Sequence, residues 1–167
     1  MKSVLPIKIA ALAQRVVAEN IAAGRTIALA ESCTGGLVAA ALTEIPGSSA
    51  VFGSGYVTYS NDAKMKMLGV NADILDTFGA VSVAVAWAMA QGALKKSGAD
   101  IVVAISGVAG PDGGTEKKPV GTVVFAVAEK DGEPEEMTAD RKDFGSDKSR
   151  AEIRAFATLH ALELLLP

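Results

Sequence analysis

Hydrophobic residues recur at helical spacing in some segments of this chain and form short continuous runs in others. Helical spacing of Ile9, Leu12, Val16 and Ile21 predicts an amphipathic first helix that ends at Gly24. The same spacing and its caps predict helices at 35–43, between Ser60 or Asn61 and Gly69, near 71–77, near 82–97 and at about 147–166. Short apolar runs predict strands at 26–30, 50–59, 101–106 and 120–129, with a weaker strand at 135–143.

The order of these elements predicts an α/β fold. Helices alternate with strands, and the run at 101–106 is continuously apolar, as in a strand that is covered on both faces. Asp131-Gly132 is a turn signal that joins the last two strands into a hairpin. We therefore expect a three-layer α/β/α sandwich around a mixed, mostly parallel sheet with a C-terminal hairpin. No repeat or linker divides residues 1–167, which predicts a single domain.

Composition excludes several kinds of chemistry. The 167 residues include one histidine, His160, and one cysteine, Cys33, so no disulfide can form within the chain. A zinc site would have to rely mainly on carboxylates, and we expect no metal and no cofactor. A Ser-His-Asp triad would have to use His160, which we interpret as a structural residue. Proton transfer in an enzyme of this composition would rely on another base.

Charge and hydropathy bear on the partners. The formal net charge of −3 and the lack of a basic run argue against nucleic acid binding. The longest uncharged stretch, 77–94, has 18 residues, but its glycines and Gln91 favour a buried helix over a membrane span. Pro6 and Lys8 interrupt any signal peptide. We expect a cytoplasmic protein without nucleic acid or membrane partners, and its high apolar content favours a homo-oligomer.

A first candidate site lies at Ala30–Gly36, where a buried strand ends and a helix begins. Side chains at this point are exposed at the carboxyl edge of the sheet, the usual ligand crevice of open α/β folds. Gly35 and Gly36 would let an anion approach the backbone N–H groups that follow Thr34. Ser32 is therefore placed like a nucleophile. A Ser/Thr helix cap with glycine packing explains the same residues equally well.

A second segment, Tyr56–Lys64, runs from a strand into a helix. Lys64 lies in the first helical turn, where the positive end of the helix dipole disfavours a protonated amine. Burial would lower the pKa of Lys64 further, and a neutral amine can accept a proton from a serine, as in Ser-Lys variants of the triad. An ordinary surface lysine is the alternative. The phenol of Tyr59 either bridges the serine and the amine or packs along the strand.

A glycine-rich loop and two arginines complete the candidates. Ser106 ends a buried strand, and Gly107 begins a long glycine-dense loop of a kind that is more often functional than not. Arg150 and Arg154 lie four residues apart on one face of the last helix. They would bind a phosphate, or they form solvated pairs with the acidic residues nearby.

Together these segments resemble the CinA C-terminal domain family, the nicotinamide mononucleotide deamidases (PncC). The resemblance rests on the blocks AESCTGG (30–36), YSNDAK (59–64), GAVS (79–82), SGVAGPDGG (106–114) and KPVGT (118–122), in this order. It implies hydrolysis of the carboxamide of nicotinamide mononucleotide to nicotinate mononucleotide and ammonia, without a metal. The chain looks like the stand-alone form, without the N-terminal domain of longer CinA proteins.

The resemblance also implies a role for each candidate. Ser32 becomes the nucleophile, Lys64 its general base, and Tyr59 assists the proton transfer or orients the pair. The implied substrate-binding residues are Thr34, Gly35, Gly36, Ser106, Gly107 and Arg150, with a pyridine nucleotide as the small-molecule partner. The first three would hold the oxyanion through their N–H groups. The choice between Arg150 and Arg154 as the arginine that contacts the substrate stays open.

Two other functions also stay open. A thiol amidase would use Cys33 as its nucleophile, because a cysteine next to a helix N-terminus can have a lowered pKa. A non-catalytic nucleotide-binding module of competence or DNA-damage regulation would bind its ligand without turnover.

Overall fold

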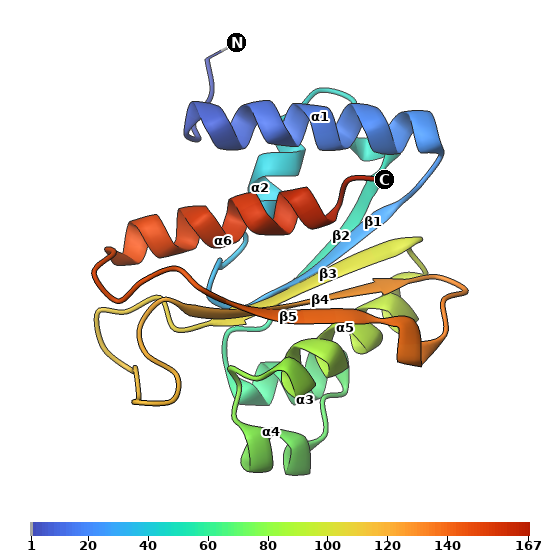
Figure 1. Ribbon diagram of the computed structural model, residues 1–167. Helices are drawn as coiled ribbons and strands as arrows, with labels where there is room; N and C mark the ends of the chain where they lie inside the picture. The colour runs from blue at the N-terminus through green and yellow to red at the C-terminus, as the bar shows by residue number, and fades with distance from the viewer. Residues whose placement is uncertain (1) are drawn as a thin grey trace.

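A mixed sheet of five strands forms the centre of the computed structural model, which describes residues 2–167 (Figure 1). The strands are β1 (Ile27–Glu31), β2 (Phe52–Val57), β3 (Ile101–Gly107), β4 (Thr122–Glu129) and β5 (Thr138–Asp143), in the spatial order β2-β1-β3-β4-β5. β1 pairs in parallel with β2 and β3, whereas β4 pairs antiparallel with β3 and β5. The expected mixed sheet with a C-terminal hairpin is confirmed. The sheet is not mostly parallel as expected: two pairings are parallel and two are antiparallel, because no helix separates β3 from β4.

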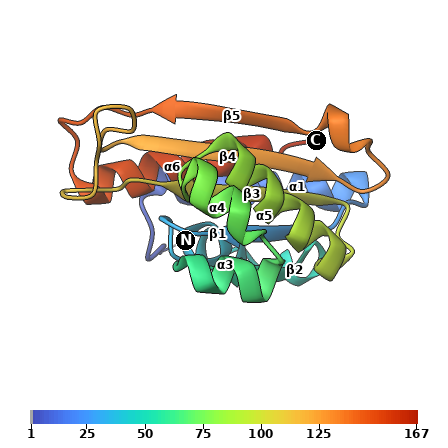
Figure 2. The same ribbon diagram turned by 90° about the horizontal axis from the view of Figure 1, so that it is seen from below.

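Helices cover both faces of the sheet, which confirms the three-layer sandwich. The upper layer in Figure 1 consists of α1 (Ile7–Ala23), α2 (Leu37–Thr43) and α6 (Arg150–Leu164). The lower layer, seen face-on in Figure 2, consists of α3 (Asn61–Leu68), α4 (Ala72–Phe78) and α5 (Val83–Ser97). Single-turn 3-10 helices occur at Ser48–Ala50 and Pro134–Glu136. No helix within residues 2–167 has the length and apolar character needed to cross a bilayer.

The predicted ends of α3 agree with local chemistry, whereas α2 and α6 begin later than predicted, at Leu37 and Arg150. The Ser60 hydroxyl accepts a hydrogen bond from the Ala63 N–H and caps α3, and Gly69 ends that helix in the left-handed conformation. The connection between β4 and β5 is longer than the tight Asp131-Gly132 turn that the sequence predicts. It contains the 3-10 helix Pro134–Glu136, and pairing begins again only at Thr138.

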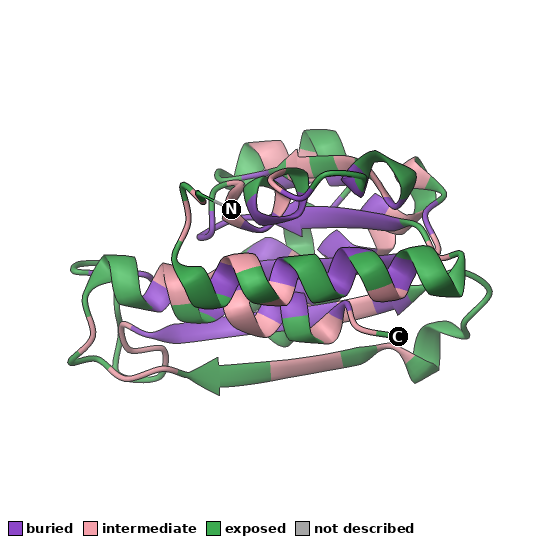
Figure 3. Cartoon of the chain, turned by 90° about the horizontal axis from the view of Figure 1, so that it is seen from above, coloured by how far each residue is buried: buried purple, intermediate pink, exposed green. Residues whose placement is uncertain are grey.

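Alternating side chains of the central strands fill two apolar cores. Ile27 and Leu29 of β1 belong to the core beneath α1, α2 and α6, whereas Ala28 and Ala30 belong to the core beneath α5. Figure 3 shows the buried inner strands and the exposed strand β5 at the edge of the sheet. The small side chains on the lower face let α5 pack closely against the sheet. Because both faces of the sheet are covered by apolar layers, polar groups are accommodated at the carboxyl ends of β1 and β2.

Gly92 of α5 lies against the C-terminal end of α3. A Cβ added at Gly92 would be 1.9 Å from the Leu68 carbonyl oxygen, so the helices must separate to admit it. Alanine normally stabilises a helix interior relative to glycine, by up to about 1 kcal/mol. We nevertheless expect Gly92→Ala to lower the free energy of unfolding by about 1–3 kcal/mol in urea denaturation, because overpacking outweighs helix propensity.

The control for this prediction is Gly53→Ala in β2. Nothing lies within 4 Å of a Cβ added at Gly53, so we expect the free energy of unfolding to change little. A Gly92→Ala variant as stable as the wild type would contradict the close approach of α5 to α3.

Candidate functional site

The carboxyl ends of β1 and β2 open into a crevice. The chain leaves β1 toward α2 in one helical layer and leaves β2 toward α3 in the other, so these adjacent strand ends diverge (Figure 1). A cavity of about 300 Å³ lies at this edge. Of the predicted site residues, Ser32, Tyr59, Lys64, Ser106, Gly107 and Arg150 line it. Thr34, Gly35 and Gly36 belong to the turn after Ser32 and do not line it.

Ser32 and Lys64 meet in this cavity. The Nζ atom of Lys64 lies 3.0 Å from the Ser32 Oγ, and it also contacts the carbonyl oxygens of Thr58 at 2.8 Å and Tyr59 at 3.3 Å. Lys64 is only 1% exposed, and none of these three partners carries a charge. Burial therefore lowers the pKa of Lys64 from its ordinary value of 10.5.

The two carbonyl groups determine what the Lys64 amine can do. A neutral amine has two N–H bonds, and the Thr58 and Tyr59 carbonyls can accept both of them. The lone pair of the nitrogen then faces the Ser32 hydroxyl. In this state the amine can accept the hydroxyl proton as the oxygen attacks an electrophile. Sequence reasoning did not identify Thr58, which acts through its main chain and has no recognisable side-chain signal.

Glu31 and Ser32 are adjacent in sequence, but their side chains lie on opposite faces of the sheet. The Ser32 N–H donates to the Ile105 carbonyl at 2.9 Å and so continues the ladder of β1 and β3. The buried Glu31 carboxylate accepts hydrogen bonds from the N–H groups of Gly36, Val38 and Ala39, at 3.0, 3.2 and 2.9 Å. Sequence analysis gave Glu31 no role of its own, although a charged residue at the end of an apolar strand was the available signal.

The contacts of Glu31 bear on the expectation that the N–H groups of Thr34, Gly35 and Gly36 hold an oxyanion. The Gly36 N–H is bound to Glu31, and the Gly35 N–H donates to the Ser32 carbonyl at 3.0 Å. The expectation that these two glycine N–H groups are free to hold an oxyanion is therefore wrong. The N–H of Thr34 has no acceptor within residues 2–167, but Thr34 is fully buried and does not line the cavity, so this N–H is not placed to hold an oxyanion either.

Arg150 and Tyr59 form one side of the cavity. Arg150 donates to the Gly110 carbonyl at 2.6 Å and to the Tyr59 hydroxyl at 2.9 Å. The phenol of Tyr59 is thus bound to Arg150 and does not bridge Ser32 and Lys64, which corrects that possibility. The main-chain carbonyl of Tyr59, and not its ring, contacts Lys64.

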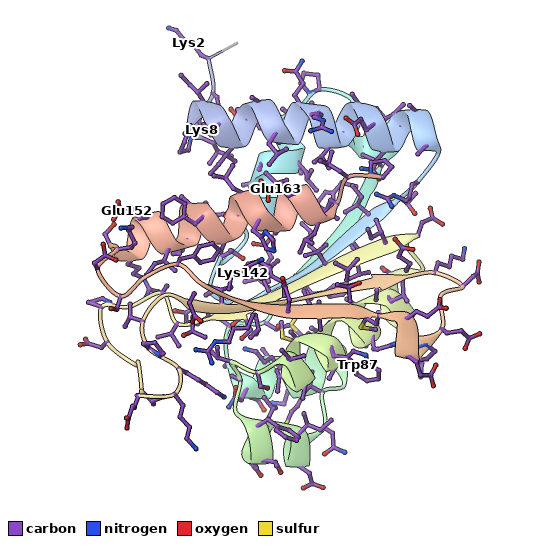
Figure 4. The ribbon with its side chains drawn as sticks, viewed as in Figure 1. Lys2, Lys8, Trp87, Lys142, Glu152 and Glu163 are labelled. Carbon is purple, nitrogen blue, oxygen red and sulfur yellow. The ribbon has the colours of Figure 1, made fainter. Side chains whose placement is uncertain are left out.

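Arg154 has different partners from Arg150. It donates from Nε to the Cys33 carbonyl at 3.1 Å and from Nη2 to the Thr34 carbonyl at 3.2 Å, and it does not line the cavity. Solvated pairing with acidic neighbours is therefore wrong for both arginines. Figure 4 shows Glu152 at the beginning of α6, where it forms a capping box with Ser149 and fixes the start of the helix that carries both arginines.

The other candidate side chains have defined partners. Ser106 is 1% exposed and donates to the Ala80 carbonyl at 2.8 Å, which joins the end of β3 to the segment before α5. Burial raises the pKa of the Cys33 thiol to about 12, which counts against a Cys33 thiolate nucleophile. His160 packs edge-on against Phe125, with 4.6 Å between ring centroids, in agreement with a structural role. Within residues 2–167 no three His, Cys, Asp or Glu side chains are grouped to hold a metal.

A family model, a relative and a solved structure all relate this chain to CinA proteins. A model of the CinA C-terminal domain matches residues 9–167. Nicotinamide-nucleotide amidohydrolase PncC of Escherichia coli K12 is 52% identical over 144 residues, which are 86% of this chain and 84% of that protein. The crystal structure of competence/damage inducible protein CihA from Agrobacterium tumefaciens has a TM-score of 0.93 and 47% identity, and covers 98% of this chain and 97% of its own.

Other relatives are longer than this chain. The CinA-like protein of Geotalea uraniireducens is 54% identical over 142 residues, which are 85% of this chain. The chain spans 32% of the length of that protein, and 26% to 36% of the length of four further relatives. The family model matches residues 9–167, and the Escherichia coli and Agrobacterium tumefaciens relatives cover 86% and 98% of the chain, which therefore belongs to the CinA C-terminal domain family.

Proposed function

We propose that the chain is a serine amidohydrolase that converts nicotinamide mononucleotide to nicotinate mononucleotide and ammonia. The observation that carries this proposal is the contact of 3.0 Å between the buried Lys64 amine and the Ser32 hydroxyl at the cavity. The choice of substrate is supported by the 52% identity to a nicotinamide-nucleotide amidohydrolase. Ser32 is the nucleophile and Lys64 the general base, and the reaction uses no cofactor.

In the first half of the reaction, the Ser32 Oγ attacks the carboxamide carbon. Neutral Lys64 takes the hydroxyl proton, a C–O bond forms, and the carbonyl π electrons move onto oxygen. The C–N bond then breaks, and the Lys64 ammonium returns its proton to the leaving nitrogen, which departs as ammonia. The product is a nicotinoyl ester on Ser32 and a neutral Lys64.

In the second half, water takes the place of serine. Lys64 accepts a proton from water as the water oxygen attacks the ester carbon, and collapse of the second oxyanion breaks the bond to the Ser32 Oγ. The ammonium of Lys64 protonates that oxygen and restores the serine. The pyridinium charge makes the carbonyl carbon more electrophilic in both halves, as an amide carbon in the first and as an ester carbon in the second.

The test of this function is release of ammonia from nicotinamide mononucleotide by the purified chain. Ammonia is followed with a coupled dehydrogenase, and nicotinate mononucleotide is identified by chromatography. We expect both products in equal amounts. Binding of the mononucleotide without release of ammonia would contradict the proposal and support a non-catalytic nucleotide-binding module.

Arg150 supplies the positive charge for the phosphate in this proposal. A charged hydrogen bond contributes about 1.5–3 kcal/mol, so we expect Arg150→Gln to raise KM for the mononucleotide about 10- to 100-fold, with a smaller change in kcat. The measurement is steady-state ammonia release at varied substrate concentration.

The riboside of nicotinamide, which lacks the phosphate, is the matched control substrate. We expect wild type and Arg150→Gln to hydrolyse it with similar kcat/KM. An equal loss on both substrates would show that Arg150 acts through Tyr59 and Gly110 and not on the phosphate.

A further inference from the structure

The last residue of β3 lies across the sheet from Ser32. The Ser32 N–H donates to the Ile105 carbonyl at 2.9 Å, so Ser32 still takes part in the ladder between β1 and β3. In the next step of a parallel ladder, the Gly107 N–H would donate to the Ser32 carbonyl. That carbonyl accepts the Gly35 N–H at 3.0 Å instead, because the chain turns out of β1 toward α2. The Gly107 N–H is therefore left without its partner in the ladder.

The direction of the Gly107 N–H follows from the register of β3. Main-chain groups of residues two apart on a strand point to the same side, and the Ile105 carbonyl points to β1. On the other side of β3, it is Val108 whose N–H donates to the Thr122 carbonyl, at 2.8 Å. The Gly107 N–H therefore points toward Ser32, and it has no acceptor in the part of the chain that the structure describes. Gly107 and Ser32 both line the cavity, so this N–H is a free donor there.

Hydrogen bonds on both sides of Gly107 fix the direction of this donor. The Val108 N–H donates to β4, and the Val108 carbonyl accepts the Gly121 N–H at 2.8 Å. The Ser106 hydroxyl donates to the Ala80 carbonyl at 2.8 Å, which joins the end of β3 to the segment before α5. A donor that is held in place before the reaction stabilises developing negative charge without reorganisation.

We propose that the Gly107 N–H is an oxyanion donor of the reaction: it binds the oxygen that becomes negative when the Ser32 Oγ attacks the carboxamide carbon. This inference rests on the proposed serine amidohydrolase function. The order of the strands separates two tasks, because Lys64 is held by carbonyls that follow β2, on one side of β1, whereas Gly107 ends β3, on the other side. Proton transfer and stabilisation of the oxyanion thus occur on different sides of Ser32.

Removal of the Gly107 N–H tests this assignment. Alanine is not suitable, because its Cβ would lie 2.8 Å from the Val123 Cγ2. Glycolic acid in place of Gly107, introduced by nonsense suppression, replaces the N–H by an ester oxygen and adds no Cβ. We expect kcat to fall about 10²- to 10³-fold with little change in KM, as on removal of other oxyanion donors.

The matched control is glycolic acid in place of Gly98. Both replacements create an ester after a serine, but Gly98 lies before β3, at the opposite edge of the sheet. The Gly98 N–H donates to the Leu94 carbonyl at 2.9 Å, so the ester removes a hydrogen bond of the fold and no group from the cavity. We expect this variant to keep the wild-type kcat.

3-Pyridineboronic acid gives a readout that does not need turnover. The Ser32 oxygen adds to boron, its proton passes to Lys64, and one oxygen of the negatively charged boronate takes the place of the oxyanion. The sequence has three Ser-Gly pairs, at 54–55, 97–98 and 106–107. Cell-free synthesis with ¹³C-carbonyl serine and ¹⁵N-glycine therefore selects three amide signals. We expect the Gly107 amide proton to shift downfield when the boronic acid is added to wild type, and the other two to change little.

The outcomes separate the inference from the function on which it rests. An ester at position 107 with wild-type kcat, or a boronate adduct that leaves the Gly107 amide unshifted, would overturn the role of Gly107 while the amidohydrolase function stands. A rise in KM at unchanged kcat, or an equal loss of kcat in the two ester variants, would overturn it as well. A wild-type chain that neither releases ammonia nor binds the boronic acid would overturn both proposals.

Discussion

Replacement of Ser32 by alanine is expected to lower kcat for amide hydrolysis by about 10⁴-fold or more, since loss of the nucleophile in a serine hydrolase has effects of this size or larger. Of the three partners of Lys64 within residues 2–167, the Ser32 Oγ alone can transfer a proton, because the other two are carbonyl oxygens. The variant should still bind the mononucleotide, since Arg150 is unchanged. Ammonia release measures the first effect, and calorimetric titration with nicotinate mononucleotide measures the second.

Cys33→Ala is the matched variant at the neighbouring position. Burial raises the pKa of the Cys33 thiol to about 12, so the thiolate is scarce near neutral pH, and we expect kcat to stay within an order of magnitude of wild type. Acid-quenched wild type should carry a base-labile nicotinoyl ester on the peptide that contains Ser32. Loss of activity in Cys33→Ala with activity retained in Ser32→Ala would reverse the assignment and make the enzyme a thiol amidase.

The sequence predicts the elements of this fold well because their signals are local. The ends of α1 and α3 follow from Gly24, Ser60 and Gly69, whose side chains or backbone freedom act within a few residues. The β4–β5 connection was predicted less well. Asp131-Gly132 predicts a two-residue turn, but the residues that follow form the 3-10 helix Pro134–Glu136 before pairing begins again.

The contacts of the site could be predicted only in part. That Ser32 and Lys64 approach one another follows from two adjacent parallel strands that both end at the same edge of the sheet. The partners of Arg154 could not be predicted, because they are main-chain carbonyls more than one hundred positions away in sequence. The sequence analysis missed the capture of the Gly36 N–H by Glu31, although a charged residue at the end of an apolar strand was a signal for it.

Replacement of Lys64 by methionine or arginine is expected to lower kcat by about 10³-fold or more, the upper range of effects for general bases. Methionine has no basic atom, and arginine stays protonated near neutral pH, so neither variant can take the Ser32 proton. Retention of activity by Lys64→Arg would show that Lys64 supplies only a positive charge. Ser60→Ala, which removes the cap of α3 but no group from the cavity, is the control for local destabilisation.

The pH dependence follows from the lowered pKa of Lys64, which is caused by burial. Only the neutral amine is active, so kcat/KM is expected to rise with pH with unit slope and to reach its plateau below the ordinary lysine pKa of 10.5.

The stability of the fold depends on the same pKa. Between the lowered pKa and 10.5 the unfolded chain binds more protons than the folded chain at Lys64, so the free energy of unfolding rises with pH over that window. Lys64→Met lacks this contribution, and its stability relative to wild type should fall as pH rises. Kinetics and denaturation over the same pH range both measure the pKa of Lys64 in the folded chain. The midpoint of the activity profile must equal the pH at which the free energy of unfolding begins to rise.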